Sequence, residues 1–256
     1  MPLSGVKRIG IRTLLGITIL IFIASATVRV QQYAFRRRAE RLYAEIQAVE
    51  YGKTTLAQIQ TTFRKWRPAY DASGPCTVND CPAVITIGDF AYAHGEFFGN
   101  HPRFRRAYGM LGGRPSAVIA NVGIDNGVAH GKSYATYVEV FPKESEAVGN
   151  TPMGYELIGE ARFVSALRPE QRVGSGHRQY WIGGPGGCSI CIAIWVYVTP
   201  DASAEEIQRL TSFDFSCITR WWRPCLEKWD LMPGAWVQAE NDRSVPALTP
   251  ERSFIP

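Results

Sequence analysis

An apolar run near the N-terminus limits what this chain can become more than any other feature. Residues 13–28, TLLGITILIFIASATV, carry no charged side chain. Basic residues bracket the run: Lys7, Arg8 and Arg12 precede it, and Arg29 and Arg36 to Arg38 follow it. An uncharged segment between cations is typical of an export signal or a membrane anchor.

Two interpretations of this segment stay open. A cleaved signal peptide would use Leu14–Ile23 as its apolar region and Ala24–Ala26 as a small-residue cleavage site. An uncleaved anchor would run over residues 9–30, which suffices for the roughly 20 residues that span a bilayer. We favour the anchor, because the residues after Val28 continue a helical pattern and because basic residues just after a cleavage site hinder translocation.

Charge is concentrated around this segment. Residues 1–41 hold eight Lys/Arg and one Asp/Glu, whereas residues 42–256 hold 20 basic and 22 acidic residues. The part expected to fold is therefore nearly neutral, which argues against a nucleic-acid partner. Five positive side chains soon after the run would keep the C-terminal part inside the cell. The cysteines favour the opposite side, so we expect a single-pass protein of the cell membrane with an extracytoplasmic C-terminal domain.

Six cysteines fall in three close pairs with the spacings C-x4-C, C-x2-C and C-x7-C. They are Cys76 and Cys81, Cys188 and Cys191, and Cys217 and Cys225. In an exported chain an even number of paired cysteines favours disulfides, and we expect the first and third pairs to close local loops. A zinc site and a redox pair are the alternatives. The C-x2-C pair leads into a β-branched segment and not into the helix that a redox pair requires.

A helical hairpin is expected directly after the anchor. Apolar residues recur at helical spacing from Phe35 to Val49, and again from Leu56 to Trp66. A short turn over Tyr51–Thr54 would join the two helices, with Thr55 and Gln58 forming a capping box for the second.

The turn contains Gly52-Lys53-Thr54, the letters that end a phosphate-binding loop. Such a loop needs a glycine five residues before Gly52, and this chain has Gln47 there. We therefore expect a turn with a solvent-facing lysine, and no bound nucleotide.

Strand-like segments separated by Gly, Pro and Asn occupy the rest of the chain. They are Ala83–Ala93, Ser116–Ile124, Ser133–Phe141, Tyr155–Phe163 and Cys191–Val198. Asn126-Gly127 is a strong hairpin turn signal, and Ser203 with Glu206 opens a further helix. The sum predicts an α+β fold, with helices packed on a mainly antiparallel sheet.

Four regions follow from these patterns. We expect an anchor over residues 1–31, a juxtamembrane helical hairpin over 32–68, an α+β extracytoplasmic domain over 69–237 and a polar tail over 238–256.

One stretch, GDFAYAHGEFFGNH, gathers residues that could carry chemistry. His94 and His101 could bind a metal, and His94 with Glu96 could act as an acid and a base. These spacings match no common ligand motif, and polar residues at a strand end explain them as well. We expect no cofactor, and an enzymatic activity is the less favoured interpretation.

The layout resembles a group of bacterial membrane-anchored proteins of unknown function. The likeness covers Arg36 to Trp236 and consists of a basic anchor, a Gly-Lys-Thr turn, a cysteine pair near the first strand and the closing patterns FDFSC and LMPGAW. Residues Glu50–Trp66 also resemble small outer-membrane assembly lipoproteins, in which a Gly-Thr turn joins two helices ahead of a short sheet.

The function expected from these features is binding. The chain would be a membrane-tethered, non-enzymatic module that contacts a protein or ligand of the cell envelope. The alternative is an extracytoplasmic hydrolase or metal-dependent enzyme centred on His94, Glu96 and His101.

Overall fold

A computed structural model describes residues 3–69, 81–140, 155–175, 178–184, 191–220, 225 and 227–242. The strands are β1 (Ala83–Gly88), β2 (Ser116–Asp125), β3 (Val128–Val140), β4 (Tyr155–Phe163), β5 (Tyr180–Gly183) and β6 (Cys191–Val198). The helices are α1 (Leu3–Gln47), α2 (Leu56–Phe63), α3 (Phe90–Ala93), α4 (Gly95–Asn100), α5 (Pro102–Met110), α6 (Pro169–Ser175), α7 (Ala204–Thr211), α8 (Ser216–Thr219), α9 (Lys228–Leu231) and α10 (Pro233–Asn241).

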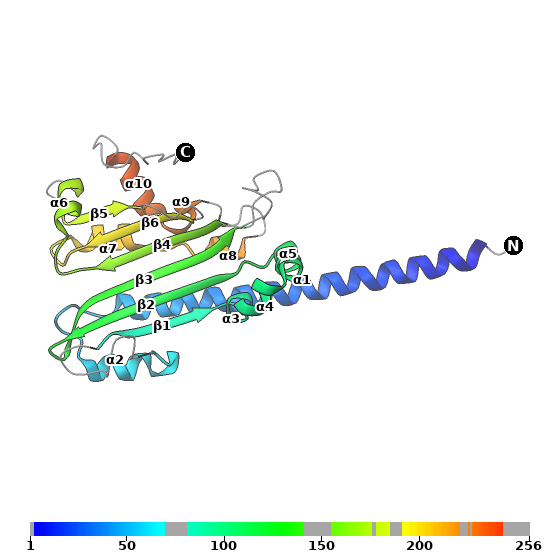
Figure 1. The fold of residues 1–256 in the computed structure, drawn as a ribbon, viewed down its shortest axis with the longest axis horizontal. Helices are drawn as coiled ribbons and strands as arrows, with labels where there is room; N and C mark the ends of the chain where they lie inside the picture. The colour runs from blue at the N-terminus through cyan, green and yellow to red at the C-terminus, as the bar shows by residue number, and fades with distance from the viewer. Residues whose placement is uncertain are drawn as a thin grey trace.

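Helix α1 is a single continuous helix of 45 residues, and is therefore about 67 Å long. Its N-terminal part projects away from the rest of the chain, and its C-terminal part lies along the sheet (Figure 1). The continuity beyond Val28 confirms the sequence prediction. Among the described residues, α1 contains one stretch that is long and apolar enough to cross a membrane, judged by length and composition.

The six strands form one sheet in the order β1-β2-β3-β4-β6-β5. All neighbours are antiparallel except β4 and β6, which run parallel. Asn126 and Gly127 connect β2 to β3 with φ angles of 51° and 78°, as a two-residue turn of this sequence requires. The predicted α+β class with a mainly antiparallel sheet is confirmed.

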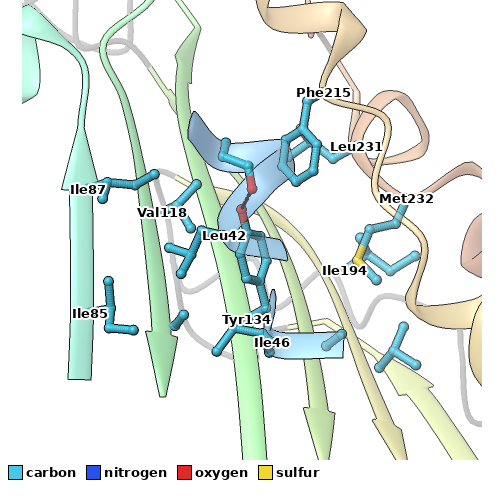
Figure 2. Close-up of a cluster of buried hydrophobic side chains, with 14 of the residues drawn as sticks. Leu42, Ile46, Ile85, Ile87, Val118, Tyr134, Ile194, Phe215, Leu231 and Met232 are labelled. Atoms are coloured by element: carbon cyan, nitrogen blue, oxygen red, sulfur yellow. Dashed lines mark hydrogen bonds between the residues drawn. The ribbon is translucent and has the colours of Figure 1, made fainter. Parts of the chain in front are cut away.

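The core lies between one face of the sheet and the C-terminal half of α1, together with the C-terminal helices. Figure 2 shows Leu42 and Ile46 of α1 beside Tyr134 of β3, with Leu231 and Met232 completing the cluster. The Tyr134 hydroxyl donates a hydrogen bond of 3.0 Å to the carbonyl of residue 39 in α1. The helix that could span a membrane is therefore also a core element of the domain.

The C-terminal end of α1 is held by a lysine from the sheet. Lys132 Nζ donates to the carbonyl oxygens of Gln47 at 2.8 Å and Val49 at 2.7 Å. The Gln47 carbonyl is one of those that a helix end leaves without an internal partner, and the Val49 carbonyl lies just beyond the helix. Burial lowers the pKa of Lys132 to about 8.

The predicted turn between the first two helices is confirmed. Gly52 has a φ of +69°, and Lys53 is largely exposed with its ammonium 2.9 Å from the Glu50 carboxylate. Thr55 and Gln58 form the predicted capping box at the start of α2. Beyond α2, a 3₁₀ turn over Arg64–Trp66 brings the indole nitrogen of its last residue to 2.7 Å from Glu45 of α1.

One strand prediction was wrong. The segment Ala83–Ala93 is not a single strand, because β1 ends at Gly88 and helix α3 follows. Asp89 causes the change: its carboxylate accepts a hydrogen bond of 2.8 Å from the Tyr92 backbone nitrogen and so caps α3. His94 and Glu96 therefore lie in the helical segment after β1, and not at the end of a strand as the sequence suggested.

The four cysteines that the structure describes are oxidised, as the sequence predicted. Cys217 and Cys225 form a disulfide with a Cα separation of 4.8 Å, which excludes a zinc site at this pair. Cys81 and Cys191 are also disulfide-bonded. Cys76 and Cys188 lie outside the described residues, so the predicted Cys76–Cys81 pairing stays a prediction.

Candidate functional site

A pocket of about 240 Å³ lies between the helical segment α3–α5 and the adjoining end of the sheet. The helices contribute Ala91, Tyr92, Gly95, Phe98, Gly99 and Arg105, and the sheet end contributes Pro115, Ala117, Tyr137, Glu139 and Glu156. Along β2 and β3, Ala117 and Tyr137 are cross-strand partners that alternate with the core residues. The pocket therefore opens on the face of the sheet opposite to α1.

Two glutamates define the electrostatics of the pocket. Glu139 of β3 and Glu156 of β4 are directly paired across the antiparallel ladder, an arrangement that is unfavourable for two like charges. Burial raises the pKa of Glu156, and the neighbouring charge of Glu139 raises it further. Burial also raises the pKa of Glu139, against the opposing effect of Arg105.

Only one of these carboxylates is neutralised within the part of the chain that the structure describes. Arg105 Nε donates to Glu139 at 3.0 Å. None of the described residues forms an ion pair or a hydrogen bond with Glu156. The pocket therefore retains a negative charge that a cationic group could balance.

Aromatic side chains line the same pocket as this charge. Tyr92 and Phe98 line the helical side of the pocket, and Tyr137 lines the sheet side. Burial raises the pKa of Tyr137, and the charges of Glu160 and Glu156 act in the same direction, so its hydroxyl stays protonated at neutral pH. A carboxylate among aromatic faces is a suitable environment for an ammonium or guanidinium group.

A buried hydrogen-bond network fixes the helical wall of the pocket to α1. Gln32 Nε2 lies 2.7 Å from Asp89 Oδ2 and 2.8 Å from the Tyr108 hydroxyl, which itself donates to Asp89 at 2.8 Å. Gln32 is fully buried and Asp89 is only 4% exposed. Burial raises the pKa of Asp89, although each of these hydrogen bonds opposes the shift.

Neither the network nor the pocket was predicted from the sequence. Gln32 interrupts the apolar face of α1, and a polar residue at such a position is the one signal that could have indicated a buried partner. The two glutamates are 17 positions apart in sequence, and only the register of β3 with β4 brings them together.

The structure also places the candidate metal and acid–base residues. His94 Nδ1 lies 2.8 Å from the Phe90 carbonyl and His101 Nδ1 lies 2.9 Å from the Phe97 carbonyl, and both imidazoles are exposed. Glu96 is exposed in the first turn of α4. Within the described ranges, no three His, Cys, Asp or Glu residues are grouped so as to hold a metal ion. A site at these residues stays a prediction.

Comparison with known proteins supplies no function for this chain. No protein-family model matches it, and neither does any curated protein or solved structure.

Proposed function

We propose that this protein is a membrane-tethered, extracytoplasmic binding module whose pocket receives a cationic group from a partner in the cell envelope. The observation that carries the proposal is the cross-strand pair of Glu139 and Glu156, of which Arg105 neutralises one member. A lysine or arginine side chain of a partner protein would balance the other carboxylate.

The size of the pocket favours a side chain over a cofactor. Its volume of about 240 Å³ is below the roughly 300–1,000 Å³ of pockets that enclose drug-sized ligands. Aromatic faces attract a cationic side chain, and Tyr92, Phe98 and Tyr137 supply such faces in the pocket. Binding would be weakened by salt, because the recognised group is charged.

Two observations support the proposed location. Helix α1 runs without interruption from the apolar stretch into the core, so an uncleaved anchor would hold the domain at the bilayer. The Cys217–Cys225 disulfide is of a kind that forms in oxidising compartments. Adding protease to intact cells tests the orientation: degradation of the C-terminal domain is expected, and its protection would contradict the proposal.

A binding experiment tests the role of the pocket. The full chain in detergent is titrated with a tetralysine peptide, and isothermal calorimetry measures the dissociation constant for the wild type and for Glu156→Gln. A charge-assisted hydrogen bond is worth about 1.5–3 kcal/mol, so the variant should bind at least about tenfold more weakly.

Glu205→Gln is the matched control. Glu205 is an exposed glutamate in the first turn of α7, outside the pocket, and the substitution removes the same charge. Its dissociation constant should equal that of the wild type, and tetraglutamate should not bind any of the three proteins. Equal weakening by both substitutions would show that only net charge matters, and would overturn the proposal.

A further inference from the structure

The helical segment that forms one wall of the pocket carries exposed apolar side chains on its outer surface. Phe97, Phe104 and Met110 are 45%, 58% and 83% exposed. The rings of Phe97 and Phe104 contact each other with centroids 5.5 Å apart, and Met110 is exposed at the C-terminal end of the same segment; these three side chains are the apolar patch. An exposed apolar cluster of this kind marks a surface that contacts a partner protein or a membrane.

The position of this patch along α1 indicates a membrane and not a partner protein. Ser25 Oγ donates a hydrogen bond of 3.2 Å to the carbonyl of Leu111, the residue after Met110. Val28 is buried in a cluster with Phe98 and Tyr108. In an anchor over residues 9–30, these contacts lie in its last two turns, because each turn takes 3.6 residues. The α3–α5 segment therefore packs beside α1 at the point where an anchor over these residues would leave the bilayer (Figure 1).

The charges around the patch fit a lipid surface. Residues 90–115 hold four arginines and one glutamate. Arg103 and Arg106 flank Phe104 at distances of one and two residues, and both are exposed. Arginines beside exposed aromatic residues are typical of helices that lie in the interface of an anionic membrane.

We propose that α4 and α5 lie in the outer interface of the bilayer, with Phe97, Phe104 and Met110 inserted among the acyl chains and Arg103 and Arg106 at anionic headgroups. The domain would then rest on the membrane with a fixed orientation. This inference uses the anchor of the proposed function but is independent of what the pocket binds.

Spin labelling measures the depth of the patch. Every described cysteine is disulfide-bonded, so Met110→Cys offers a new thiol for a nitroxide. The full chain is reconstituted at high dilution into vesicles of phosphatidylethanolamine and phosphatidylglycerol. Relaxation by oxygen, which concentrates in lipid, is compared with relaxation by a water-soluble nickel chelate. The ratio of oxygen to nickel accessibility should be severalfold higher at position 110 than at a label on Lys53→Cys.

Lys53 is a suitable control because its side chain is 78% exposed in the turn after α1, at the end of that helix opposite to the anchor. A label at position 110 that is as accessible to nickel as the control label would overturn the proposal. A label shielded from both reagents would show that a second copy covers the patch, and would overturn it too.

A second comparison tests whether insertion of the patch requires the two arginines and anionic lipid. In vesicles of phosphatidylcholine alone, and in the Arg103→Gln, Arg106→Gln double variant, the label at position 110 should become more accessible to nickel. Unchanged accessibility in both cases would refute the role of the arginines. Carbonate extraction of the same vesicles reports separately on the anchor: release of the protein would contradict the tether of the proposed function and this inference together, whereas retention with a nickel-accessible label would contradict this inference alone.

Discussion

We expect Gln32→Leu to loosen the attachment of α1 to the α3–α5 segment. Gln32 is buried, and its amide nitrogen faces three acceptors: Asp89 Oδ2, the Tyr108 hydroxyl and the carbonyl of Arg114. Leucine has a similar size and favours a helix, but it cannot donate. The substitution therefore removes the hydrogen bonds and leaves the shape of the site nearly unchanged.

The magnitude follows from the geometry of that amide. The two N–H groups of the Gln32 amide can make two full hydrogen bonds. The bond to Asp89 has an ionised acceptor and is worth about 1.5–3 kcal/mol, whereas the other bond is worth about 1 kcal/mol. The Gln32 carbonyl oxygen is buried and has no hydrogen-bond partner among the described residues. Leucine removes this unpaired oxygen, which restores about 1 kcal/mol of stability. The free energy of unfolding should therefore fall by about 1.5–3 kcal/mol in total.

Urea unfolding of the full chain in detergent measures this change through tryptophan fluorescence, since Trp195 lies in the sheet and Trp236 packs on the core. Gln31→Leu is the matched control, because it makes the same substitution one residue earlier, at a side chain that forms no hydrogen bond with any described residue. The control should change stability by less than about 0.5 kcal/mol.

Equal effects of the two substitutions would refute the reasoning. They would mean that the hydrogen bond from Gln32 to the Asp89 carboxylate contributes nothing to stability, and that the network does not hold α1 in place. A larger loss for Gln32→Leu, with an unchanged slope against urea, would locate the effect in the native state.

Two further predictions concern the pocket glutamates and the disulfide. The folded pKa of Glu156 is raised, so its protonated form contributes stability that is fully present below an unfolded pKa of about 4.3 and is lost as pH rises through the folded value. Relative to Glu156→Gln, the wild type should lose stability in urea unfolding as the pH rises from about 4.3, and parallel pH profiles would contradict this. Replacing Cys217 and Cys225 together by serine should cost about 2.5 kcal/mol, the closure entropy of a loop of this length. Thermal unfolding without reductant measures the cost, and an unchanged midpoint would count against a structural role.

Local signals accounted for the elements that depend on neighbouring residues. The capping boxes at Thr55 and Ser203 and the Asn126-Gly127 turn were predicted correctly, because each is decided within four residues of sequence. The Cys217–Cys225 disulfide was predicted on the same basis, since its two cysteines are eight residues apart. The strand prediction that ran through Asp89 failed, because alternation of apolar residues does not reveal a side chain that caps a helix.

The apolar run with its flanking cations, the paired cysteines and the α+β class follow from the sequence by itself, because composition and periodicity encode them directly. The pocket, the Gln32–Asp89–Tyr108 network and the aromatic patch follow only from the tertiary structure. Glu139 meets Glu156 through the register of two strands, and Gln32 meets Asp89 because a helix 45 residues long extends from the apolar stretch into the core. Contacts between residues distant in sequence depend on how whole elements pack, and no local pattern records that packing.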